Sequence, residues 1–139
     1  AMHREIGQPL KECEPRSNLA GLLMGRGEFT AAKRLQRQNL VISRELGVRR
    51  IEVNALLNLI AILRNLGDFD EAESLCQEGL IISRELGNQG VESDLLLELG
   101  MIANKRGNFE ERNSFFTKGV QIKRDIGIQI DQWFIDNGY

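Results

Sequence analysis

The chain has 139 residues, of which 42% are apolar and 27% charged, with a net charge of −2; this is the composition of an ordinary soluble globular domain. The length suits one domain with a continuous core, and the apolar content argues against intrinsic disorder. A pI near 5.5 and an aromatic content of 6% argue against a basic, base-stacking surface for nucleic acid. The apolar runs are too short to span a bilayer, and the amino terminus lacks a secretory signal pattern.

Few residues are available for chemistry. His3 is the only histidine, so the chain can assemble neither a catalytic triad nor a histidine-based metal site. Cys13 and Cys76 lie far apart, and together with the absence of an N-x-S/T sequon they indicate a reducing, cytoplasmic setting. We therefore expect no enzymatic activity, no cofactor and no metal site.

The first repeating unit covers about residues 8–47. Pro9 and Pro15 each remove a backbone donor, so we expect the first helix to begin near Pro15 and to be short. A second helix follows and stops at Gly47. Its start at Glu28 has no capping box.

The second unit, residues 48–87, shows the pattern most clearly. Residues 49–66 form a helix that is apolar on more than one side, which predicts neighbours on both sides. Gly67 supplies the left-handed residue that ends this helix, and Asp68 caps the next one, which stops at Gly87.

The third unit, residues 88–127, repeats the capping pattern with Asn108 and Glu111, and a terminal helix is expected over residues 128–136. Aromatic side chains crowd the end of the chain, at Trp133, Phe134 and Tyr139. These rings either cap the third hairpin or form an interface for a partner, a further repeat or a second copy.

The units repeat every forty residues without an insertion. Arg44-Glu45-Leu46-Gly47 returns as Arg84-Glu85-Leu86-Gly87 and again as Arg124-Asp125-Ile126-Gly127, and Arg4-Glu5-Ile6-Gly7 is its first copy. A strict period of this size predicts stacked helical hairpins, each burying its apolar face against the next. We expect an all-α solenoid of three hairpins with a short C-terminal helix.

The units resemble the tetratricopeptide repeat. The pattern's first Leu is matched at Leu19, Leu59 and Leu99, the following small position at Ala20 and Gly100, and the later small position at Gly79 and Gly119. Phe116 keeps the second-helix Phe, which Gln36 and Cys76 replace, and Arg44, Arg84 and Arg124 replace the terminal Pro. The chain is thus similar to the forty-residue class of these repeats. The resemblance implies one domain over residues 1–139 that forms a right-handed α–α superhelix.

In this family the first helices line a concave groove that binds a peptide or helical segment of a partner. The positions that carry over are Ser17, Asn54, Leu57, Asn58, Ala61, Arg64, Asp94, Leu97, Glu98, Met101 and Lys105. The open alternative is that the leucines belong to the core and the amides are only solvated. One variant of the family binds a terminal carboxylate through a clamp that contains cations, and here Asp94 and Glu98 stand at two of the clamp positions. We therefore hypothesise that the partner segment is basic there, unless Arg64 and Lys105 neutralise these two carboxylates.

The resemblance implies a protein–protein interaction scaffold in the cytoplasm, with no nucleic-acid or membrane partner. The alternative is a ligand-sensing or regulatory module of a larger bacterial signalling ATPase or transcription regulator. Residues 1–50 carry a charge of +5 and residues 51–139 a charge of −7. This asymmetry allows an end-to-end homo-oligomer, although drift among solvated faces explains it equally. Ala1-Met2 resembles a cloning remnant, which is consistent with a piece cut from a longer protein.

Overall fold

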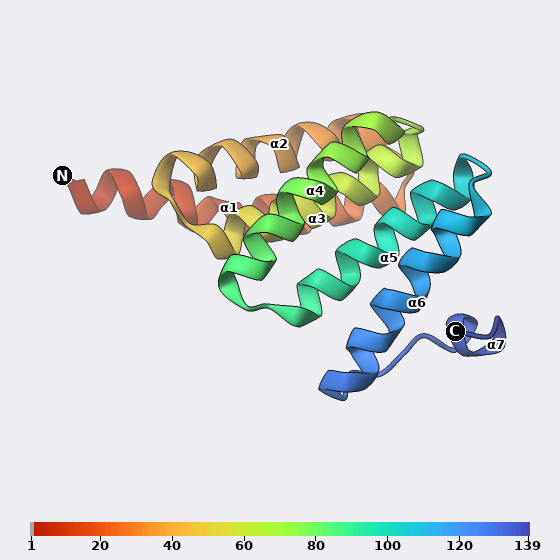
Figure 1. Ribbon diagram of the computed structural model, residues 1–139. Helices are drawn as coiled ribbons and strands as arrows, with labels where there is room; N and C mark the ends of the chain where they lie inside the picture. Colours follow the sequence, from red (N-terminus) through yellow and green to blue (C-terminus); the bar gives the residue numbers. More distant parts are fainter. Residues whose placement is uncertain (1) are drawn as a thin grey trace. The chain divides into compact units, whose positions relative to one another are not determined.

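The computed structural model describes the backbone of residues 2–139 and the side chains of residues 9–139, and within them it contains helices and no strand (Figure 1). The helices are α1 (Met2–Gly25), α2 (Phe29–Leu46), α3 (Arg49–Leu66), α4 (Phe69–Leu86), α5 (Gln89–Lys105), α6 (Phe109–Ile126) and α7 (Gln132–Asp136). The prediction of an all-α chain with a short terminal helix is confirmed, and α1 packs against α2 and α5 against α6 as the first and third hairpins. Since α3 and α4 fall in different units, the middle hairpin stays a prediction. The right-handed sense of the superhelix stays a prediction.

The chain divides into two compact units. The first, Ala1–Asp68, contains α1 to α3, and the second, Phe69–Tyr139, contains α4 to α7. None of the helices described in residues 2–139 combines the length and the apolar character that crossing a membrane requires. That both units belong to one domain stays a prediction.

The helix ends follow the glycine pattern of the sequence. Gly67 ends α3 with φ 83°, a left-handed conformation that only glycine adopts without strain, as expected. The equivalent glycines of the other turns also have positive φ, between 65° and 78°: Gly27, Gly47, Gly87, Gly107 and Gly127. The forty-residue period therefore places the same backbone turn after every long helix.

Side-chain hydrogen bonds confirm one predicted helix cap and show a second cap that was not predicted. The side-chain oxygen of Asn108 accepts a hydrogen bond from the Glu111 N–H at 3.4 Å, so the expected cap of α6 is present. Asn88 caps α5 in the same way, accepting from the Val91 N–H at 3.0 Å, which the sequence patterns did not indicate. Glu28 makes no side-chain cap at the start of α2, as expected.

The expected start of the first helix was wrong. α1 begins at Met2 and continues through both prolines to Gly25. The ring of Pro15 is exposed, so it causes no clash with a neighbouring helix. Asn39 of α2 donates to the Cys13 carbonyl at 3.0 Å, which ties this part of α1 to its neighbour. Packing against α2 therefore outweighs the helix-breaking tendency of proline.

The terminal helix is shorter than expected. It covers Gln132–Asp136 instead of 128–136. The Asp131 side chain accepts a hydrogen bond from the Trp133 N–H at 2.8 Å and so sets the start of the helix.

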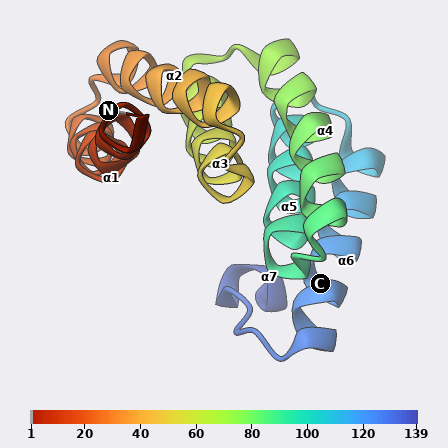
Figure 2. The same ribbon diagram turned by 90° about the vertical axis from the view of Figure 1, so that its left-hand side faces the viewer.

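In the first unit, α2 lies against both α1 and α3 (Figure 2). A buried cluster of Ala20, Ala32 and Ile62 joins the three helices. The Glu52 carboxylate is also buried, and Arg44 Nε lies 3.2 Å from it. Arg84 and Glu92 repeat this pair at 3.5 Å in the second unit. The repeated arginine thus connects each second helix to the first helix that follows it.

In the second unit, glycines allow α5 to approach its neighbours closely. A Cβ atom on Gly119 of α6 would lie 2.8 Å from the Leu97 side chain, and one on Gly79 of α4 would lie 3.0 Å from Leu95. A Cβ atom on Gly100 would lie only 2.3 Å from the Phe116 ring. The small positions predicted from the repeat pattern are therefore sites of close helix packing.

The C-terminal segment covers the third hairpin. Leu97, Phe116, Val120 and Phe134 form a buried cluster, against which Met101, Ile130 and Tyr139 pack; we call these seven residues the C-terminal cluster. The Phe134 ring meets the Phe116 ring edge-on at 5.1 Å. Trp133 and Ile135 remain about half exposed. The aromatic end of the chain thus caps the third hairpin and leaves part of its surface open.

The Gly100→Ala variant is expected to destabilise the second unit by about 1–3 kcal/mol, because the added methyl group would overlap the buried Phe116 ring. Urea denaturation followed by the fluorescence of Trp133, the only tryptophan, measures this. The control is Gly21→Ala in α1, where nothing lies within 4 Å of the added atom. Circular dichroism should show that this control is neutral or stabilising by up to about 1 kcal/mol. Equal effects of both variants would contradict the packing described.

The Phe134→Ala variant is expected to cost about 3–5 kcal/mol in the stability of the second unit, because it removes a buried ring from the C-terminal cluster. The neighbouring control, Ile135→Ala, changes an exposed side chain and should have an effect of less than about 1 kcal/mol. Urea denaturation and light scattering are measured on both variants. A Phe134→Ala protein of unchanged stability that only loses self-association would show an interface instead of a cap.

Candidate binding site

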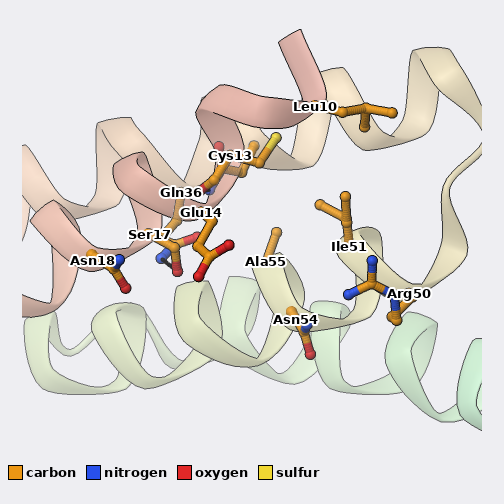
Figure 3. Close-up of a pocket in the computed structure, with 11 residues that line it drawn as sticks. Leu10, Cys13, Glu14, Ser17, Asn18, Gln36, Arg50, Ile51, Asn54 and Ala55 are labelled. Carbon is orange, nitrogen blue, oxygen red and sulfur yellow. Dashed lines mark hydrogen bonds between the residues drawn. The ribbon is translucent and has the colours of Figure 1, made fainter. Parts of the chain in front are cut away.

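The first unit contains a polar pocket of about 400 Å³ between its three helices (Figure 3). We call it the α1–α3 pocket. It is lined by Leu10, Cys13, Glu14, Ser17, Asn18, Gln36, Asn39, Arg50, Ile51, Asn54 and Ala55. A volume of this size accommodates one or two side chains of a partner or a small ligand.

Two residues of the predicted groove line this pocket, and a third lies beside it. Ser17 of α1 and Asn54 of α3 are both part of the lining. Asn58, one helical turn after Asn54, donates from Nδ2 to Ser17 Oγ at 3.4 Å. Asn54 and Asn58 are exposed, whereas Leu57, Ala61 and Arg64 on the same helix are partly buried. The fold therefore brings the polar part of the predicted lining of α1 and α3 together.

The predicted lining on α5 is less open. Leu97 is 7% exposed and belongs to the C-terminal cluster, where Met101 packs against it. For Leu97 the alternative of a core leucine therefore holds. Asp94 forms an ion pair with Lys123 of α6 at 2.9 Å. This partner is neither Arg64 nor Lys105, the two cations considered from the sequence. Glu98 is partly buried and is likewise not free, while Lys105 is exposed.

Gln36 lies buried at the α1–α3 pocket with half of its amide unused. Its side chain is only 2% exposed. Nε2 donates to Ser17 Oγ at 3.2 Å, but Oε1 has no hydrogen-bond partner among the described residues. A buried acceptor without a donor destabilises a fold, because it has lost its water and gained nothing in return. The pocket therefore contains an acceptor that is able to take a hydrogen bond.

The neighbouring Asn39 is fully used. Its Nδ2 donates to the Cys13 carbonyl, and its Oδ1 accepts from Arg16 Nη1 at 2.9 Å. This side chain bridges α1 and α2 and holds the wall of the pocket in place. Gln36 and Asn39 are both buried amides on α2, but only Gln36 has an oxygen without a hydrogen-bond partner among the described residues.

Cys13 is not a reactive group in this pocket. Burial raises the pKa of its thiol, although the nearby Arg16 opposes this, so the thiol is protonated at neutral pH. The thiol donates to the Pro9 carbonyl at 3.5 Å. Neither cysteine forms a disulfide and both are buried, and within the described part of the chain no three His, Cys, Asp or Glu side chains group as metal ligands do.

Two charged residues of the pocket lining have no ion-pair partner within the described part of the chain. They are Glu14 of α1 and Arg50 of α3, and both are exposed. Figure 3 shows Glu14 near Ser17 and Gln36, with Arg50 toward the opposite end. The pocket thus has an acceptor-rich end and a cationic end.

The sequence patterns did not identify Gln36, Asn39 or Arg50 as site residues. Gln36 and Asn39 belong to a second helix, whereas the predicted groove used first helices alone. The available signal was the departure from the repeat pattern, since Gln36 stands where Phe116 stands in the third unit.

Comparison with protein families supports the resemblance. The model of the tetratricopeptide repeat matches residues 16–46 and 53–86, which run from within α1 to the end of α2 and from within α3 to the end of α4. A search of curated proteins finds no match to the chain. Tetratricopeptide repeats are in general protein–protein interaction modules and typically non-enzymatic scaffolds. On the match of two successive repeats and the all-helical fold, residues 16–86 of the chain consist of tetratricopeptide repeats.

Proposed function

We propose that this protein binds a peptide or a helical segment of a partner protein on the face formed by α1 and α3. The observation that carries the proposal is the grouping of Ser17, Asn54 and Asn58 around an open pocket. These residues come from two helices and from two different repeats. Their amides and hydroxyl supply both donors and acceptors at an exposed surface, which suits the backbone of a bound segment.

Some of the remaining predicted residues fit the same role, although Leu97 belongs to the core and Asp94 is paired with Lys123. Leu57 and Ala61 are partly buried on α3 and offer apolar surface beside the amides. In the second unit, taken by itself, α5 offers the exposed Lys105 and the partly buried Glu98 and Met101. Methionine adapts well to irregular apolar surfaces. The two buried cysteines, which form no disulfide, are consistent with the proposed cytoplasmic setting.

A second candidate function is the sensing of a small ligand as part of a larger signalling protein. The volume of the α1–α3 pocket, about 400 Å³, falls in the range of small-molecule sites. However, such sites are mostly apolar, whereas this pocket is lined mainly by amides, a hydroxyl and charges. The exposed polar lining favours a partner segment over a small molecule.

The Asn54→Ala and Asn58→Ala variants are each expected to weaken peptide binding by about 3- to 10-fold, the effect of losing one or two hydrogen bonds. Peptides are selected on the protein from a displayed random library and then titrated by calorimetry. Gln38→Ala serves as the control, because Gln38 is an exposed amide on α2 outside the pocket.

Selected peptides that bind both asparagine variants as tightly as the unchanged protein would contradict the proposed face. A selection that yields no binding peptide at all, combined with a small molecule that raises the melting temperature, would favour the sensor.

A further inference from the structure

The α1–α3 pocket occupies the place that the C-terminal cluster occupies in the second unit. Four residues of the pocket correspond, two forty-residue periods later, to four residues of that cluster. The corresponding pairs are Ser17 and Leu97, Gln36 and Phe116, Arg50 and Ile130, and Asn54 and Phe134. Each pair has one member lining the polar pocket and one in the packed apolar cluster.

The same junction of three successive helices is thus built in two ways. In the second unit, the Phe116 ring fills it together with Phe134 and Tyr139. In the first unit, polar residues stand at all four places and an open pocket remains. Apolar residues at these places would form a more stable junction, since burying polar groups costs free energy unless they are fully bonded.

The unused Gln36 Oε1 shows which chemistry the pocket lacks. The atom is an acceptor, so its missing partner is a donor. On α1, Glu14 precedes Ser17 by three residues, which places the two side chains on the same face of the helix. Ser17 in turn is bonded to Gln36. A donor that reaches Gln36 therefore enters beside an unpaired carboxylate, which favours a positive charge.

Arg50 and the net charge of the unit oppose a cation at long range. Residues 1–68 carry eleven Lys and Arg against seven Asp and Glu. Arg50 lies toward the other end of the pocket from Glu14 (Figure 3). The Glu14 carboxylate next to Gln36 decides which group binds, because at physiological salt the effect of a charge falls with its distance from the bound group.

We propose that the α1–α3 pocket is a subsite for a basic side chain, Lys or Arg, of the partner segment. The cationic group donates one hydrogen bond to Gln36 Oε1 and pairs with the Glu14 carboxylate. This assignment rests on the proposed function and specifies what that face recognises.

The test uses blocked single residues, N-acetyl-lysine methylamide and N-acetyl-norleucine methylamide, titrated into the isotope-labelled protein and followed by NMR. The two probes differ only in the ammonium group at the end of the side chain. The lysine probe should shift the side-chain amide signals of Gln36, and the norleucine probe should leave them unchanged. Equal shifts from both probes would overturn the proposal.

Of the variants of the two charged residues, only that of Glu14 should weaken binding of the lysine probe. Glu14→Gln should weaken the lysine probe by about fivefold or more, the effect of losing a charge-assisted hydrogen bond. Arg50→Gln is the matched control from the other end of the pocket, and it should leave the affinity unchanged or increase it. A blocked glutamate probe that binds through Arg50 would show an anion site instead.

Gln36→Met separates binding from folding. The change removes the unused oxygen and also the Nε2–Ser17 hydrogen bond, while Ser17 Oγ keeps its donor from Asn58. The melting temperature should therefore change little, while the affinity for the lysine probe should fall by about fivefold or more. A variant that keeps its affinity for the lysine probe would overturn the proposal.

The outcome for the peptides keeps the two proposals distinct. If library peptides bind through Asn54 and Asn58 but the lysine probe leaves Gln36 unaffected, the partner face stands and the basic subsite fails. If neither peptides nor the probe bind, both fail.

Discussion

The junction between a hairpin and the first helix that follows it is the constraint on which this protein depends. Two antiparallel helices leave an apolar face that only a further helix covers, and both units meet this need with a third helix. In the first unit α2 lies against α1 and α3, and in the second unit α7 supplies the cover for α5 and α6. The polar pocket and the aromatic cluster are two versions of this one junction.

The arginine that recurs every forty residues also contributes to this junction. Arg44 and Arg84 stand where the repeat family has proline, and each pairs with a glutamate eight residues later. Glu52 is buried, so its carboxylate needs such a partner. In both cases the second helix continues through this position and ends at Leu46 or Leu86, so its last turn carries a cation that contacts the next first helix. The forty-residue repeat thus has an ion pair between its second helix and the first helix of the next repeat.

Much of the fold could be predicted because the repeat samples the same local signals several times. The turn at Gly67 and the cap at Asn108 follow from backbone geometry that a few adjacent residues determine. The start of α1 was not predictable in this way, because contacts from α2 outweigh the local preference of Pro15. Local patterns predict helix ends well only where no distant contact competes with them.

The site was predictable in part. Ser17, Asn54 and Asn58 lie together as the family pattern indicated. Leu97 has an equally suitable position in the pattern but is buried by Phe134, which arrives from a separate helix. Gln36 was missed because its role depends on an atom without a partner, and bonding of that kind is visible only in three dimensions. Position within a repeat thus predicts which way a side chain points. Whether that side chain is accessible depends on which later segment of the chain packs over it.

The contact between Gly100 and Phe116 has a consequence for anyone who wishes to rearrange these hairpins. In the first unit the corresponding positions hold Ala20 with Gln36, so a smaller side chain on the second helix goes with a larger one on the first. The two side chains of such a pair are therefore complementary in size. Exchanging α6 for α2 alone would set Gln36 against Gly100 and leave a void, whereas moving whole hairpins keeps each pair intact. The interchangeable part in this architecture is the hairpin, not the helix.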